Sequence, residues 1–253
     1  MRLLVVSSIL TLSSLISAQP LKAQSDESMG AQIWGGEKVK PGELPSTVYV
    51  RGSNFACTGS LIKPDVVLTA AHCVASSGMY IRANSLSATT GGNKINVKRG
   101  LQHEQYRGSN LKYDIGLLFL SEPVPNAQPI TIKVEAPNPG DTVYAAGWGV
   151  TETGRTSDAL LKVELKVGDT RVCGQPPTGT NFCYVPVAGK GICFGDSGGP
   201  VYKIQDGKNY ILGVSSYISK NQCGQSDTKG YFNRAGYHIE WIRKNAGVGI
   251  AQQ

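Results

Sequence analysis

The chain contains the stretch Gly195-Asp196-Ser197-Gly198-Gly199-Pro200, which places a serine in a tight turn bounded by glycines. Such a turn exposes the serine hydroxyl and lets neighbouring backbone N–H groups converge on one point. An acyl-transfer nucleophile needs both, because the attacked carbonyl develops an oxyanion that fixed donors stabilise. A short segment rich in Gly, Ser and Asp is more often an ordinary loop, so its companions decide the interpretation.

Three further segments accompany it along the chain: Ile33-Trp34-Gly35-Gly36, Thr69-Ala70-Ala71-His72-Cys73 and Asp114-Ile115-Gly116-Leu117-Leu118. With these motifs the chain resembles the chymotrypsin/trypsin-like serine proteases over about residues 33–246. The order His72, Asp114, Ser197 is the order of that family. Subtilisins and α/β-hydrolases place the same residue types in other orders.

Short apolar runs separated by turn residues, such as 47–50 and 66–69, predict an all-β domain after residue 32. One helix is expected from about Tyr237 to Asn245, where apolar side chains share a face. The resemblance implies two antiparallel six-stranded β-barrels of the chymotrypsin-like kind, followed by that C-terminal helix. The catalytic cleft would then lie between the two barrels.

Residues 1–18 carry Arg2, an apolar run broken by serines and a small-residue end at Ser17-Ala18. This pattern is typical of a secretory signal peptide, and the run is too short and too rich in serine to favour a membrane anchor. Residues 19–32 are polar and lack periodicity, which indicates a propeptide. The protease domain would be 33–253, with a connector near 121–130, and the protein would be secreted and extracellular.

Six cysteines in an exported chain predict disulfides, although the sequence alone leaves their connectivity open. The resemblance implies the pairs Cys57–Cys73, Cys173–Cys183 and Cys193–Cys223. No metal site is expected, because the chain has no Cys-x-x-Cys pair and only His72, His103 and His238 as histidines. We expect His103 to pack in the loop before Asp114 and His238 to be exposed on the terminal helix. No cofactor is expected.

The formal net charge is +7, which can favour acidic partners but more simply serves solubility. No basic stretch is interleaved with aromatic residues, so a nucleic-acid site is not expected. The resemblance implies protein or peptide substrates, protein protease inhibitors as further partners, and a monomer.

The chemistry of the motifs is that of a catalytic triad. A serine hydroxyl needs a nearby base, and a buried carboxylate can hold an imidazole in one tautomer and compensate its charge. By resemblance, Ser197 is the nucleophile, His72 the general base and then acid, and Asp114 the orienting carboxylate. The oxyanion hole would be the backbone N–H groups of Gly195 and Ser197. The alternative is that His72 only caps a loop beside a cysteine.

The resemblance also implies activation by proteolysis. In this family a new N-terminal amine inserts and pairs with the aspartate before the serine, which here would join Ile33 to Asp196 and make the chain a zymogen. Gln32 precedes Ile33, so activation by a trypsin-like enzyme is not expected. Trp34 stands where valine is more usual in the family.

The specificity pocket is also inferred from the resemblance. Its floor would be Gly191, six residues before Ser197, which offers no carboxylate for an Arg or Lys side chain. A branched Ile218 should narrow the entrance, whereas Gly230 should leave the opposite wall open. The substrate-binding residues implied are Gly191, Ile192, Phe194, Ser216, Tyr217, Ile218 and Gly230.

These features predict an elastase-like serine endopeptidase that cuts after small or medium aliphatic residues. The main chain of 216–218 should pair with the substrate as an added antiparallel strand. One alternative is a chymotrypsin-like preference for larger apolar residues. Another is a protease-fold binding protein without catalysis, which a complete triad disfavours.

Overall fold

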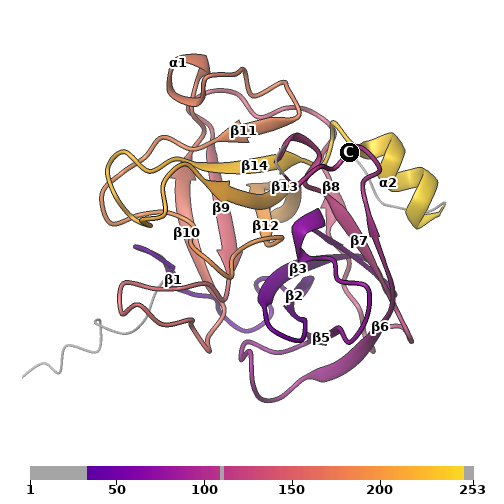
Figure 1. Ribbon diagram of the computed structural model, residues 1–253. Coiled ribbons are helices and arrows are strands. Elements are labelled where there is room, and N and C mark those ends of the chain that lie inside the picture. Colours follow the sequence, from indigo (N-terminus) through magenta and orange to yellow (C-terminus); the bar gives the residue numbers. More distant parts are fainter. Residues whose placement is uncertain (1–32, 109–110, 248–253) are drawn as a thin grey trace, which may run out of the picture. The chain divides into compact units, whose positions relative to one another are not determined.

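The computed structural model describes residues 33–108 and 111–247, drawn in colour in Figure 1. The signal peptide and propeptide predicted at 1–18 and 19–32 lie outside the described residues. In the part described, no helix is both long and apolar enough to cross a membrane.

The first half of the domain is a closed barrel of antiparallel strands in the order β2-β3-β4-β7-β6-β5. Alternating residues of these strands, including Val48, Val50, Ile81 and Leu118, fill its interior without exposure to solvent. The strands are β2 (Thr47–Arg51), β3 (Ala56–Lys63), β4 (Val66–Thr69), β5 (Tyr80–Ala83), β6 (Asn93–Gln102) and β7 (Gly116–Leu120).

The second half is an eight-stranded sheet in the order β1-β10-β9-β12-β13-β14-β11, with β8 parallel to β13. Its strands are β1 (Glu37–Lys38), β8 (Thr131–Ile132), β9 (Thr142–Gly147), β10 (Leu161–Lys166), β11 (Asn181–Cys183), β12 (Pro200–Gln205), β13 (Lys208–Ile218) and β14 (Gly230–Arg234). The N–H of Val185 donates to the carbonyl of Lys166 at 2.7 Å, and that of Gly168 to Cys183 at 2.8 Å. These bonds join the ends of β10 and β11.

Six strands, β9 to β14, therefore close on themselves, while β1 and β8 are short additions at the outside. The predicted all-β fold of two six-stranded barrels and a C-terminal helix is confirmed, with one difference. The pairing of β8 is parallel, because Thr131 and Ile132 lie beside Tyr210 and Ile211 of β13 after the connector between the barrels.

The C-terminal helix α2 (Ile239–Ala246) begins two residues later than expected and buries Ile239, Trp241, Ile242 and Ala246. One turn of helix, α1 (Thr170–Cys173), was not expected from the sequence. The Asp169 carboxylate caps it by accepting the N–H of Val172 at 2.9 Å, and Gly174 ends it with a left-handed φ of 74°.

His238 does not lie exposed on the helix, contrary to the sequence-based expectation. It precedes α2, and only 3% of its surface is exposed. Its ring lies 5.1 Å from that of His103 and 5.6 Å from that of Tyr113. Burial, with the neighbouring charges of His103 and Arg234, lowers the pKa of His238 to about 3. The expectation failed because α2 packs this end of the helix onto the loop that carries His103.

The three disulfides of the structure are Cys57–Cys73, Cys173–Cys183 and Cys193–Cys223, which are the pairs that the resemblance implies. The first fastens β3 to the short helix η1 (Ala71–Cys73). The last ties the segment before Ser197 to the loop after β13. Two of the three bonds therefore hold segments that carry predicted site residues.

The largest buried cluster spans both barrels. Ile62 and Leu68 of the first barrel pack in it with Trp148 and Val214 of the second. Segment 121–130 runs between β7 and β8 and is anchored to the first barrel, where the N–H of Ile130 donates to the Leu61 carbonyl at 2.9 Å. This shared core fixes the two barrels against each other, so side chains at their boundary have defined positions.

Candidate active site

His72 and Asp114 meet at the edge of the first barrel. His72 lies in η1, directly after β4, and Asp114 precedes β7, which pairs with β4. The backbone N–H of His72 donates to Oδ1 of Asp114 at 2.9 Å, and its ring Nδ1 lies 2.7 Å from Oδ2. Asp114 is fully buried, whereas one third of the His72 side chain is exposed. The carboxylate therefore fixes Nδ1 as the donor and leaves Nε2 for a partner at the opening.

A third donor reaches the same carboxylate from the second barrel. The Ser216 hydroxyl donates to Oδ2 of Asp114 at 2.5 Å. The sequence predicts only a substrate-binding role for Ser216, through its main chain. No spacing in the sequence indicates this bond, because the two residues meet only when the barrels dock.

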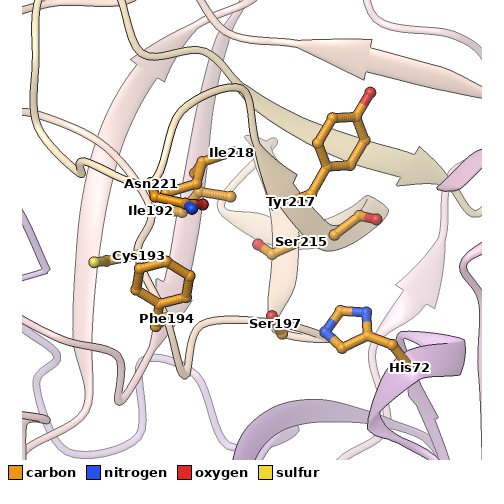
Figure 2. A pocket seen from close by; sticks show the side chains of 10 residues that line it. His72, Ile192, Cys193, Phe194, Ser197, Ser215, Tyr217, Ile218 and Asn221 are labelled. Atoms are coloured by element: carbon orange, nitrogen blue, oxygen red, sulfur yellow. The ribbon is translucent and has the colours of Figure 1, made fainter. Parts of the chain in front are cut away.

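Ser197 faces the imidazole of His72 across the boundary between the barrels (Figure 2). Its turn is held from both sides, since the Ser197 carbonyl accepts the N–H of Thr58 at 2.8 Å and the N–H of Gly198 donates to Ser215 at 2.7 Å. Gly198 has a φ of 78°, and a β-carbon there would lie 2.9 Å from the backbone nitrogen of Ala70. Only glycine fits this approach of the two barrels.

The backbone N–H groups of Gly195 and Ser197 donate to no partner among the described residues. Gly195 has a φ of 99°, and its carbonyl is turned to the Thr58 hydroxyl, which donates to it at 3.1 Å. The turn thus leaves two donors free beside the Ser197 hydroxyl. Free donors at this position can stabilise negative charge that develops on a carbonyl oxygen.

Asp196 is fully buried beneath this turn. One carboxylate oxygen accepts the N–H of Gly149 and the other that of Cys193, each at 2.8 Å. Burial outweighs these bonds and raises the pKa of Asp196 to about 7. Ile33 is also fully buried and bridges to Thr151, two residues after Gly149. The carboxylate therefore lies close to the segment that begins the described chain.

A cavity of about 220 Å³ opens beside Ser197 and is shown in Figure 2. Five of the expected substrate-binding residues line it: Ile192, Phe194, Ser216, Tyr217 and Ile218. His72, Cys193, Ser197, Ser215 and Asn221 complete the lining, and Asn221 was not expected from the sequence.

Gly191 and Gly230 do not line this cavity. Gly230 is buried rather than open, because a β-carbon there would lie 2.8 Å from Ile192 and closer still to the ring of Tyr184. The expectation of an open wall at Gly230 is therefore wrong. The sequence shows that residue 230 has no side chain but not which side chain fills its space.

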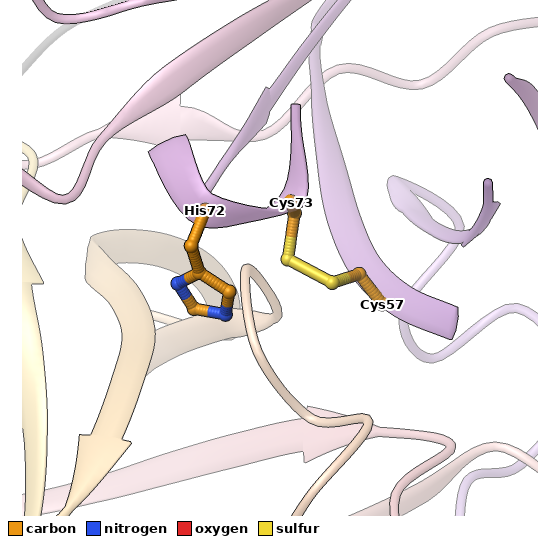
Figure 3. A group of neighbouring side chains, drawn as sticks. All are labelled: Cys57, His72 and Cys73. Carbon is orange, nitrogen blue, oxygen red and sulfur yellow. A yellow bond between two sulfur atoms is a disulfide. The ribbon is translucent and has the colours of Figure 1, made fainter. Parts of the chain in front are cut away.

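Cys57, His72 and Cys73 are the one group among the described residues whose atoms lie close enough together to suggest a metal site. Figure 3 shows that the two sulfurs form a disulfide beside His72. Neither sulfur is then a thiolate that could bind a cation. The group instead holds η1, and with it the imidazole, against β3.

Comparison with known proteins agrees with this fold. The family model described as Trypsin matches residues 33–242. Trypsin Blo t 3 of Blomia tropicalis is 32% identical over 94% of the chain and 96% of its own length. Chymotrypsin-like elastase family member 1 of Macaca fascicularis is 30% identical over 85% of the chain and 89% of its own length. Neuropsin, a serine protease expressed in the limbic system of mouse brain, superposes with a TM-score of 0.74 at 25% identity, covering 84% of the chain and 99% of neuropsin.

The fold and the relatives define a serine endopeptidase, a hydrolase that takes protein or peptide substrates. The chain belongs to the trypsin family.

Proposed function

We propose that Ser197, His72 and Asp114 form the catalytic triad of this endopeptidase. The single observation that carries the proposal is the fully buried Asp114, which holds His72 by its backbone and by its ring while the imidazole faces Ser197. Nε2 of His72 takes the Ser197 proton as Oγ attacks the scissile carbonyl, and later delivers that proton to the leaving amine. Water then hydrolyses the acyl-enzyme by the reverse transfer.

The N–H groups of Gly195 and Ser197 serve as the oxyanion hole in this proposal. Their support is the turn itself, which frees both donors and directs the Gly195 carbonyl to Thr58. Because these donors are fixed before the reaction, they need no reorganisation as the charge develops.

The proposed cleavage preference is for small or medium aliphatic residues. The apolar cavity beside Ser197, lined by Ile192 and Ile218, supports it, and Gly191 supplies no carboxylate to attract Arg or Lys. Strand β13 pairs with β14 through Tyr217 and Ile218, and the same two residues line the cavity. An extended substrate can therefore lie along this strand.

We also propose that the protein is exported by the 1–18 signal and made as a zymogen with a 19–32 propeptide before the 33–253 domain. Cleavage before Ile33 would free an amine to pair with Asp196. The support is a buried carboxylate with two backbone donors and no cationic partner among the described residues, near a buried Ile33. The active form is proposed to be a monomer open to protein protease inhibitors.

The test uses a fluorophosphonate probe on protein cleaved before Ile33. Labelling at Ser197, absent in Ser197→Ala and strongly slowed in His72→Ala, is expected. A properly folded, cleaved protein without an adduct would instead identify a binding protein with a protease fold. Profiling on a peptide library then distinguishes the possible cleavage preferences. Dominant cleavage after Phe or Tyr favours the chymotrypsin-like alternative. Dominant cleavage after Arg or Lys contradicts the proposed preference for aliphatic residues.

A further inference from the structure

Tyr184 lies next to Ile192, which lines the cavity, because a β-carbon on Gly230 would overlap Cε1 of Tyr184 and lie 2.8 Å from Cγ1 of Ile192. It follows β11, is fully buried, and has its backbone fixed where the second barrel closes. Its N–H donates to the Gly230 carbonyl at 3.4 Å, and the next residue, Val185, donates to Lys166 at 2.7 Å. The ring packs against Phe232, with centroids 5.9 Å apart. Neither the backbone nor the ring of Tyr184 is therefore free to move aside.

The Tyr184 ring occupies the space that two glycines leave empty. A β-carbon on Gly191 would lie 3.2 Å from Cζ of Tyr184 and would overlap its hydroxyl oxygen. A β-carbon on Gly230 would overlap Cε1 of the same ring. Gly191 belongs to the segment before Ser197, and Gly230 begins β14. The ring thus reaches both glycine sites, from two different segments, and both are absent from the cavity lining.

The Tyr184 hydroxyl also sets the electrostatic character of this position. It forms no hydrogen bond of normal geometry with the described residues. Burial raises its pKa to about 12, against a smaller lowering by the Ile192 backbone. The hydroxyl is therefore neutral at physiological pH and cannot form an ion pair with a basic substrate side chain.

We propose that Tyr184 determines specificity by forming the floor of the substrate pocket and setting its depth. Without the ring, the glycines at 191 and 230 would leave a deep pocket. With it, the cavity ends at Ile192, and the ring behind Ile192 limits the length of the side chain that fits before the scissile bond. This inference rests on the proposed function, because depth matters only if the cavity beside Ser197 receives the substrate.

Restriction of the pocket entrance by Ile218 and restriction of its depth by Tyr184 can be told apart by experiment. Ile218 lines the cavity and is partly exposed, so it restricts entry, whereas Tyr184 is buried below it and restricts length. Removing the ring should admit longer side chains even with Ile218 intact. A Tyr184 that served only as core filling would change stability without changing the order of substrates.

The experiment compares kcat/KM on tetrapeptide p-nitroanilides that differ only in Ala, Leu or Phe before the scissile bond. In Tyr184→Ala and Tyr184→Val the Phe-to-Ala ratio is expected to rise about tenfold or more, the usual effect of pocket size on apolar groups. Tyr184→Phe should keep the wild-type ratio within about twofold, because the ring sets the depth. Phe182→Leu is the matched control, since Phe182 is equally buried in the same cluster but packs beside Gly213, and it should lower Tm without changing the ratio.

Active-site titration with the fluorophosphonate accompanies every variant. Labelled Tyr184→Ala or Tyr184→Val with an unchanged ratio would overturn the floor assignment and leave the triad intact. An unlabelled wild-type enzyme would overturn both proposals. The wild-type enzyme alone also tests the proposal, so the test does not depend on the folding of any variant. A wild-type Phe-to-Ala ratio of kcat/KM above one would refute a shallow pocket.

Discussion

Asp196 makes the uncleaved chain sensitive to pH in a way that can be calculated. Its carboxyl has a pKa of 3.8 in its ordinary state and about 7 when folded, because burial penalises the charge. Well below pH 3.8 the group is protonated in both states. As pH rises from about 4 to 7 the unfolded chain ionises while the folded chain keeps the proton, so folding becomes less favourable. Each pKa unit corresponds to about 1.4 kcal/mol, which gives a full loss of about 4 kcal/mol, of which about 3 kcal/mol falls between pH 4.5 and 7.5.

The assay is urea unfolding of the uncleaved protein carrying Ser197→Ala, which prevents self-cleavage, at pH 4.5 and 7.5. The same measurement is made on the double variant Ser197→Ala, Asp196→Asn. This variant lacks the titrating carboxyl but keeps all other titratable groups, including the buried histidines. The difference between the two proteins isolates Asp196. Equal pH dependence in both would refute the reasoning. After cleavage before Ile33, the proposed ammonium partner should lower the pKa and abolish this loss.

Three other predictions follow from the site. Asp114→Asn should lower kcat by about 10³–10⁴-fold, because the amide no longer fixes the His72 tautomer. Stopped-flow kinetics measure the acylation rate, and a rate equal to that of the wild type would contradict this role of Asp114. Ile218→Gly should widen the entrance and raise kcat/KM for Phe and Tyr substrates relative to Ala, whereas an identical peptide profile would show that Ile218 does not gate the pocket. Replacing Cys57 and Cys73 together by serine should cost about 2–4 kcal/mol in unfolding free energy, measured by denaturant titration; an unchanged midpoint would argue against a structural role for this bond.

The sequence by itself predicts much of the proposed site. Motifs around His72, Asp114 and Ser197 carry local chemistry, and each needs particular residue types within a few positions. A buried aspartate before a strand and a serine between glycines can therefore be recognised along the chain. The disulfide pairs were also correct, because the family resemblance supplied a connectivity that spacing alone could not.

Other features were invisible to the sequence for a common physical reason. The bond from Ser216 to Asp114 joins residues far apart in the chain, and no local pattern encodes it. His238 appeared to be an exposed helix residue, yet packing against His103 and Tyr113 buries it. Both arise from the way in which separate elements dock.

The sequence alone determined the class of chemistry, the order of the proposed triad residues and the all-β character, since these depend on residue type, short spacing and periodicity. Only the tertiary structure decided the shape of the pocket. The sequence predicted an open wall at Gly230, but it does not show which side chain fills the space beside a glycine. Here Tyr184, which follows β11 where the second barrel closes, fills the space beside Gly230 and Gly191.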